Sequence, residues 1–278
     1  MRKALLLLML LTGVAESKSI DWIITDFPPY YMINDADEGT GRDELIIDLF
    51  HTYLPDYENN KVYFPASRAI RALSDKRNTF CMLSLYKTPQ RQKFIRFSQN
   101  YTTIGLSPTI ATTTATLEAL GFENASKVRL KPFIEQNKLV LGVVMQRSYG
   151  SALDQVISSI EKDQVVIRPG QDALESLTYM LKKGRVDAVI GYPSEHFYLH
   201  KQTNTKDVVQ LLLEDVDPIV HGYVGCTDNT TGREIIKKID SVANTVVNSQ
   251  EFKTVMQKWL PSYLEIKLSK LMKNKEAR

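Results

Sequence analysis

The strongest chemical signal in the sequence is the segment TPQRQKFIRFS at residues 88–98. It follows an apolar run, TFCMLSL, which is typical of a buried strand and ends at Leu85. An arginine at a turn just beyond a strand can bind a carboxylate through both arms of its guanidinium group. Backbone N–H groups and a nearby hydroxyl supply further donors. We therefore predict an anion-binding element built on Arg91 and Ser84.

Aromatic and hydroxyl side chains follow several other predicted strands. In open α/β sheets, ligands bind beyond the carboxyl ends of the strands. The residues that this rule brings to one cleft are Phe27, Tyr30, Ser84, Arg91, Ser148, Tyr149 and Tyr192. Taken singly, Arg91 could simply form a surface ion pair, and each tyrosine could simply pack in the protein interior. Seven suitable residues at strand ends together favour a shared ligand site.

Motifs of common catalytic centres are missing: the sequence has no GxSxG, HExxH, Walker glycine loop or GxGxxG. His196 and His200 are four residues apart on a predicted helix, a spacing that can hold a metal ion. Glu195 is the only acid nearby, and no third ligand is implied. We expect these histidines to be surface residues, and we expect neither a metal nor a cofactor.

Composition and charge exclude several classes of protein. The chain has 278 residues, of which 43% are hydrophobic and 24% are charged, as in ordinary globular proteins. Its net charge of +3 comes from 35 basic and 32 acidic residues without a long basic block before the end, so no nucleic-acid partner is expected. Two cysteines are too few for a thiolate zinc site, but they are enough for one bridge.

The first residues predict export. Two basic residues precede an apolar run over residues 4–11, and small residues follow it. This pattern predicts a signal peptide over residues 1–17, cleaved after Ala15 or Ser17. A run of this length spans roughly 12 Å as a helix, too short for a membrane core of about 30 Å. No later segment is apolar enough to cross a bilayer, so we expect a soluble, exported protein.

Strands and helices alternate along the rest of the chain, and the pattern occurs twice. Such alternation predicts α/β architecture with a largely parallel sheet. The predicted strands are 19–25, 62–64, 79–85, 139–145, 165–167 and 186–191, and the predicted helices include 44–54, 172–183, 232–248 and 250–259. We therefore expect two similar lobes, each a mostly parallel sheet flanked by helices.

Two extended segments, at residues 100–114 and 208–227, enter and leave the middle of the chain. They predict two hinge strands, with the C-terminal helices returning to the first lobe. The expected units are a first lobe over 18–107 and 220–264, a second lobe over 108–219, and a frayed basic tail over 265–278.

The chain resembles the periplasmic solute-binding proteins of the polar amino-acid type, which are the two-lobed receptors of ABC importers. The resemblance covers nearly all of the mature chain, through FPPY, ELIIDL, TPQRQKFIRFS, QRSYGS, GRVDAVIGY and EFKTVMQKWL. It implies that Arg91 binds a ligand carboxylate with help from Ser84. It also implies that Phe27 or Tyr30 stacks on the ligand, and that the loop of Ser148 and Tyr149 contributes from the second lobe.

The sequence departs from the family pattern at two positions. Tyr192 stands where amino-acid binders often carry an acid for the ligand's ammonium group, and the next acid is Glu195. Tyr86 stands where a small hydroxyl residue is common. Arg68, in ASRAIRAL, matches an arginine of divergent relatives and belongs either to the cleft or to the lobe surface. The resemblance therefore implies a carboxylate-bearing ligand in general more firmly than an α-amino acid.

We expect a monomeric receptor that closes on an amino acid or another small carboxylate and presents it to an ABC importer. Two alternatives remain open at this stage. One is a dehydratase-like periplasmic enzyme with Glu195 or His196 as its acid or base, and the other is a ligand-sensing partner of a membrane receptor. Cys81 and Cys226 are expected to lie in the first lobe and to form a disulfide, although free buried thiols are the alternative.

Overall fold

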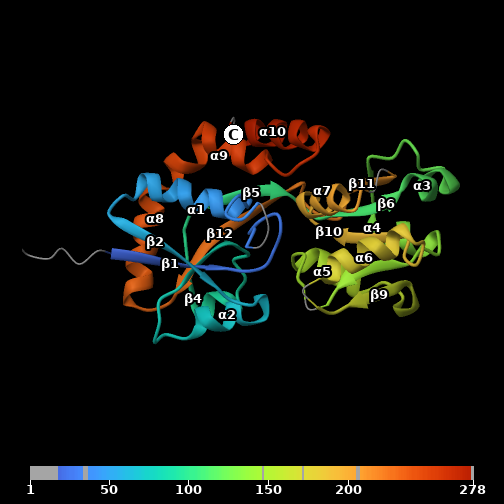
Figure 1. The fold of residues 1–278 in the computed structure, drawn as a ribbon. Coiled ribbons are helices and arrows are strands. Elements are labelled where there is room, and N and C mark those ends of the chain that lie inside the picture. The colour runs from blue at the N-terminus through green and yellow to red at the C-terminus, as the bar shows by residue number, and fades with distance from the viewer. Residues whose placement is uncertain (1–17, 34–36, 146, 171, 205–206, 277–278) are drawn as a thin grey trace, which may run out of the picture.

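The computed structural model describes residues 18–276 except 34–36, 146, 171 and 205–206, so the predicted signal peptide lies outside the described residues. Two lobes stand side by side, each a six-stranded sheet flanked by helices (Figure 1). Within the described part of the chain, no helix combines the length and the apolar character that a membrane crossing requires. The predicted two-lobed α/β fold is confirmed.

The first lobe contains strands from both ends of the chain. Its strands are β1 (Lys18–Ile24), β2 (Tyr57–Tyr63), β3 (Cys81–Leu85), β4 (Ile95–Phe97), β5 (Thr103–Leu106) and β12 (Ile219–Thr227). Their order is β2-β1-β3-β12-β4, and β5 also pairs with β12. The lobe's helices are α1 (Arg42–Tyr53), α2 (Ala66–Ser74), the 3-10 helix η1 (Arg91–Lys93), α8 (Thr230–Asn248), α9 (Gln250–Gln257) and α10 (Ser262–Glu276).

The second lobe is formed by the middle of the chain. Its strands are β6 (Thr109–Thr113), β7 (Lys127–Val128), β8 (Leu141–Val144), β9 (Val165–Arg168), β10 (Ala188–Gly191) and β11 (Val208–Leu213), in the order β7-β11-β6-β10-β8-β9. Its helices are α3 (Thr114–Leu120), α4 (Leu130–Gln136), α5 (Ser151–Ser158), the 3-10 helix η2 (Lys162–Gln164), α6 (Ala173–Lys182) and α7 (Pro193–Gln202).

Both sheets are mixed, whereas the sequence predicted mostly parallel ones. The chain passes from β5 to β6 through residues 107–108 and returns from β11 to β12 through a turn at residues 214–218, so it crosses between the lobes twice. The returning strands run opposite to the outgoing ones, because β11 pairs antiparallel with β6 and β12 pairs antiparallel with β5. Strands that are connected through helices pair in parallel, as the sequence predicted. These parallel pairs are β1·β2, β1·β3, β8·β9 and β8·β10.

Helix α8 shows how the first lobe buries its core. Ile235, Ile239 and Val246 lie on one face of this helix and pack in the same cluster as Trp22 and Leu83 of the sheet. This spacing of apolar residues places them on one side of a helix, which is what covers a sheet. The helix begins at an Asn229 side chain that accepts a hydrogen bond from the Gly232 N–H group.

Cys81 of β3 and Cys226 of β12 stand opposite each other in the antiparallel pair, and their sulfur atoms are joined in a disulfide. Both cysteines are fully buried in the first lobe. The bond ties the N-terminal part of this lobe to the strand that returns from the second lobe.

The C-terminal tail differs from the expectation that residues 265–278 fray. Helix α10 continues to Glu276, and its Leu264, Leu268 and Met272 are buried in the core of the first lobe. These residues recur every fourth position and form one apolar stripe between the basic residues. The prediction of a frayed tail was wrong because it relied on the basic composition of the segment and overlooked the helical spacing of its apolar residues.

We predict that Leu268→Ala destabilises the protein by about 2–4 kcal/mol, because Leu268 is fully buried and its loss leaves a cavity. Ile266→Ala, on the same helix but 57% exposed, is the matched control and should change stability by less than about 0.5 kcal/mol. Chemical denaturation of both variants measures the difference. Equal effects of the two substitutions would contradict docking of α10.

Candidate functional site

A cavity of about 220 Å³ lies between the lobes. It forms where β1 and β3 of the first lobe and β8 and β10 of the second lobe end. Its polar and aromatic lining residues are Phe27, Tyr30, Tyr31, Arg42, Asp43, Ser84, Tyr86, Arg91, Thr103, Arg147, Ser148, Tyr192, Ser194 and His221. The predicted residues that line the cavity are Phe27, Tyr30, Ser84, Tyr86, Arg91, Ser148 and Tyr192.

The other three predicted residues lie elsewhere. Arg68 is an exposed residue of α2, so its position does not fit a ligand-binding role. Tyr149 is buried in the second lobe, where its hydroxyl accepts a hydrogen bond from the Val144 N–H group and donates one to the Ile190 carbonyl. Glu195 is also buried and belongs to an ion pair described below.

Ser84, at the end of β3, adopts a left-handed backbone conformation with φ of 57°. Side chains other than glycine rarely adopt this conformation, and it often marks functional sites. The Ser84 hydroxyl accepts a hydrogen bond from Arg42 at 3.1 Å and lies 2.9 Å from the Thr103 hydroxyl. Gly222 of β12 faces it closely, since a Cβ atom there would come within 2.7 Å of the Ser84 Cα atom. The close approach holds the serine at the cavity wall.

Arg42 is a site residue that the sequence analysis missed. Its guanidinium group donates a hydrogen bond to Asp43 at 2.7 Å and lies 4.2 Å from the ring centre of Tyr30. Burial acts to lower the pKa of Arg42, but Asp43 and Tyr30 together raise it above its ordinary value. Arg42 begins helix α1 instead of following a strand, so the strand-end rule did not include it. The available signal was the charged run GRDE at the start of the predicted helix.

Arg147 is the second missed residue, and it explains the position of Glu195. Its guanidinium group donates two hydrogen bonds to the two carboxylate oxygens of Glu195, at 2.8 and 2.6 Å. Glu195 also accepts a hydrogen bond from the Tyr192 N–H group. Burial opposes the charge of Arg147, but Glu195 raises its pKa above the ordinary value. Only 15% of the arginine side chain and 3% of the glutamate side chain are exposed, so the pair is held away from water.

Arg91 presents the third guanidinium group to the cavity, from helix η1. The Thr88 hydroxyl accepts a hydrogen bond from the Arg91 backbone N–H group, and the Tyr86 carbonyl accepts one from its guanidinium group at 3.3 Å. Partial burial lowers the pKa of Arg91. Among the described residues, no carboxylate lies within ion-pair distance of it. Arg91 therefore keeps unused donors in the cavity.

Two tyrosines connect the lobes across the cavity. The hydroxyl oxygens of Tyr86, in the first lobe, and Tyr192, in the second lobe, are 2.6 Å apart. Burial raises the pKa of both groups, so both hydroxyls stay protonated and one can donate to the other. The edge of Tyr192 also meets Tyr30, with 6.3 Å between ring centres. These contacts hold the two lobes together in the structure.

The two histidines of α7 are not surface residues, contrary to expectation. His196 is fully buried, and its ring stacks on that of His200 with 5.9 Å between centres. Burial lowers the pKa of His196 to about 3 and that of His200 to about 4. In the part of the chain that the structure describes, no group of three histidine, cysteine or acidic side chains is placed to hold a metal ion. The pair belongs to the packing beneath the cavity wall, since Gly191 lies directly against His196.

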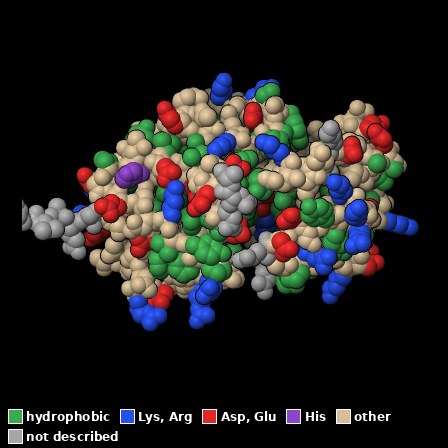
Figure 2. All heavy atoms as spheres, in the orientation of Figure 1, with side chains coloured by type: hydrophobic (Ala, Val, Ile, Leu, Met, Phe, Trp, Pro, Cys, Tyr) green, Lys and Arg blue, Asp and Glu red, His purple; other side chains and the backbone are tan. Residues whose placement is uncertain are grey.

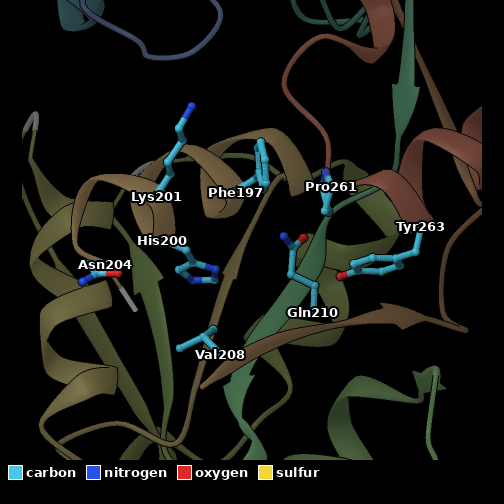
Figure 3. Close-up of a pocket in the computed structure, with 8 residues that line it drawn as sticks. All are labelled: Phe197, His200, Lys201, Asn204, Val208, Gln210, Pro261 and Tyr263. Atoms are coloured by element: carbon cyan, nitrogen blue, oxygen red, sulfur yellow. The ribbon is translucent and has the colours of Figure 1, made fainter. Parts of the chain in front are cut away.

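A second cavity, of about 380 Å³, lies where α7 of the second lobe meets the start of α10. Figure 3 shows His200, Gln210 and Tyr263 directed toward the same space. Its lining residues are Phe197, His200, Lys201, Asn204, Val208, Gln210, Pro261 and Tyr263. Lys201 is exposed, and neither a buried charge nor an anion-binding cluster is present in this lining. The first cavity therefore carries the chemistry of the candidate site.

A family model of bacterial extracellular solute-binding proteins, family 3, matches residues 22–262. The chain belongs to this family. A search of curated protein sequences gave no match.

Solved structures with the same fold as this family 3 solute-binding protein include binding proteins and a sensor. The substrate-binding protein of an amino-acid ABC transporter is 16% identical, with a TM-score of 0.60 over 87% of this chain and 98% of that one. The probable amino-acid ABC transporter extracellular-binding protein from Bacillus subtilis is 17% identical, with a TM-score of 0.66 over 89% and 100%. A histidine kinase sensor domain with similarity to periplasmic binding proteins is 11% identical, with a TM-score of 0.63 over 87% and 96%.

We predict that the two tyrosine hydroxyls stabilise the closed form of this solute-binding protein as a single unit. Tyr86→Phe or Tyr192→Phe should shift the closed-to-open ratio toward open by up to about tenfold, the effect of losing one hydrogen bond. The double variant should open no further than the single ones, because either loss breaks the same bond. Small-angle X-ray scattering measures the opening, and Tyr179→Phe, at an exposed position on α6, is the control. If the effects of the two single substitutions add up in the double variant, the hydrogen bond between Tyr86 and Tyr192 is contradicted.

We predict that the solute-binding protein loses stability as the pH falls below about 6.5. Unfolded histidine has a pKa near 6.5, whereas His196 and His200 titrate at about 3 and about 4 in the folded chain. The unfolded state therefore binds protons that the folded state does not, and the free energy of unfolding should drop by on the order of 3 kcal/mol between pH 7 and pH 5.

Denaturant titrations across this pH range measure the effect. The double variant His196→Gln, His200→Gln should flatten the profile, whereas His51→Gln, at an exposed residue of α1, should leave it unchanged. An equally steep profile in the double variant would assign the pH dependence to other groups.

Proposed function

We propose that this protein is a periplasmic receptor that captures a small carboxylate-bearing ligand, an amino acid or a similar molecule, between its lobes. It acts as a monomer and presents the closed, loaded form to an ABC-type importer. The observation that carries the proposal is Arg91, whose guanidinium group faces the interlobe cavity without a carboxylate partner among the described residues. A guanidinium group with free donors in a partly desolvated site favours a carboxylate.

Other features of the cavity support an anionic ligand. Ser84 and Ser194 line it and can contribute hydroxyl donors beside Arg91, whereas the Ser148 hydroxyl donates to Asp154. Helices α1 and α7 begin at its wall, and helix N-termini favour negative charge. A volume of about 220 Å³ corresponds to roughly seven water molecules, which suits a small molecule.

Hinge bending is supported by the connections between the lobes. Two short connections, β5 to β6 and β11 to β12, join the sheets, and such segments can absorb a change of angle. Residues from both lobes line the cavity, so a ligand that contacts both favours the closed state. The family of extracellular solute-binding proteins fits a partner in the membrane that recognises this closed state.

A sensory role is the second candidate, because one structural neighbour is a histidine kinase sensor domain. In that role the closed form would contact a membrane receptor instead of a permease. Deleting the gene and measuring uptake of the identified ligand separates the two. Loss of uptake supports transport, whereas intact uptake with loss of a ligand response supports sensing.

The enzyme alternative has less support. Both acid–base candidates are engaged or remote, since Glu195 is paired with Arg147 and His196 is not part of the cavity lining. The family and the structural neighbours are binding proteins. We therefore propose binding without turnover.

We predict that a thermal-shift screen of the mature protein gives hits among small carboxylates. A ligand at one hundred times its Kd adds about 2.7 kcal/mol to the stability of the native state. Arg91→Ala should weaken binding of such a hit by about ten- to a hundredfold, the effect of losing charge-assisted hydrogen bonds. The matched control is Arg68→Ala, which removes an exposed arginine of the same lobe and should leave the affinity unchanged.

Isothermal titration of the wild type and both variants with the hit gives the affinities. Equal binding by wild type and Arg91→Ala would show that Arg91 does not hold the carboxylate. A stronger effect of Arg68→Ala would move the binding site to the surface of α2.

A further inference from the structure

Asp43 is the one acidic side chain in the described cavity lining, and Glu195 lies directly behind this lining. An arginine of the same lobe neutralises each of them. In the first lobe, the Asp43 carboxylate accepts a hydrogen bond from Arg42 at 2.7 Å. In the second lobe, both oxygens of Glu195 accept hydrogen bonds from Arg147. Neither pair spans the cleft, so opening and closing of the lobes leaves both intact. A ligand meets these carboxylates as parts of neutral pairs.

We propose that the ligand is an organic monocarboxylate without an ammonium group, and that α-amino acids are disfavoured at this site. The proposal rests on the carboxylate receptor proposed above and specifies its substrate class. Three guanidinium groups line the cavity. Two of them are paired, one with Asp43 in the lining and one with Glu195 behind it, which leaves the positive charge of Arg91 without an acidic partner among the described residues. One carboxylate neutralises that charge. A zwitterion would add a second cation, and the described cavity lining offers it no acid other than Asp43, which is already paired with Arg42.

Three aromatic rings of the cavity already lie against the protein's own cations. An ammonium group can bind the face of an aromatic ring within about 6 Å of its centre. Here Arg42 covers Tyr30 at 4.2 Å, and Arg147 covers both Phe27 and Tyr192 at 5.0 Å. The protein's own cations therefore take up the attraction that these rings could offer.

The hydroxyls of the tyrosine bridge offer no substitute. Tyr86 and Tyr192 hydrogen-bond each other, and burial keeps both protonated and neutral. A bound amino acid would thus bury an ammonium group without a paired charge, at a cost that exceeds tenfold in affinity. A ligand without an ammonium group avoids this cost.

The test compares each amino acid with the acid that lacks only its amino group. The pairs are L-phenylalanine with hydrocinnamate, L-leucine with isocaproate, and L-alanine with propionate, measured by isothermal titration on the full mature chain. In every pair that binds, the deamino acid should bind at least about tenfold more tightly. Arg91→Ala should weaken this binding by about ten- to a hundredfold.

A variant sharpens the test by releasing one carboxylate. Arg147→Met frees Glu195, so it should shift the affinity ratio of each pair toward the amino acid by at least about tenfold. Arg185→Met, at an exposed arginine of the same lobe, is the matched control and should keep the wild-type ratio. Denaturation curves check that both variants fold. If Arg147→Met does not fold, the comparison of amino acids with deamino acids on the wild-type protein still tests the proposal.

The outcomes separate this inference from the proposed function. Tighter binding of amino acids than of their deamino partners by the wild type would overturn the inference and leave the carboxylate receptor standing. An unchanged ratio in a folded Arg147→Met variant would contradict the role of the Arg147–Glu195 pair. No binding of any carboxylate by the wild type would overturn the proposed function, and the inference with it.

Discussion

The burial of three guanidinium groups between two lobes is the constraint on which the rest of this site depends. A buried charge is costly unless a counter-charge or hydrogen bonds compensate it. The protein compensates Arg42 with Asp43 and Ser84, and Arg147 with Glu195, and each of these partners fixes a further element. The hydrogen bond from Arg42 to Ser84 anchors the start of α1 to the end of β3. The pair of Arg147 and Glu195 connects the loop after β8 to the start of α7.

The backbone of the first lobe is adapted to hold this arrangement. Ser84 keeps a left-handed conformation at the end of β3, and Gly222 allows β12 to pass close beside it. The disulfide between Cys81 and Cys226 joins the same two strands. On the surface shown in Figure 2, acidic and basic side chains alternate over both lobes, so unlike charges are mixed there. The unbalanced positive charge lies inside the cleft, at Arg91.

The sequence predicted the parts of the site that follow from local pattern. Apolar runs located β1, β3, β8, β9 and β10, but not β4, β7 or most of the polar strand β2. The strand-end rule brought Phe27, Ser84 and Tyr192 to one cavity. It could not find pairs that form only in three dimensions, such as Arg147 with Glu195, which are 48 positions apart. Burial was equally hidden: the spacing of His196 and His200 gave no sign that packing excludes them from water.

The order of the strands has a consequence for how the chain is made. Strand β12 lies between β3 and β4, yet it is separated from them by the whole second lobe. While the ribosome proceeds from the N-terminus, the first sheet stays divided until residues 219–227 have emerged. The second sheet, in contrast, comes from one uninterrupted stretch. A chain that lacks these residues therefore carries an open sheet edge at β3, and the first-lobe wall of the interlobe cavity is completed only after the whole second lobe is present.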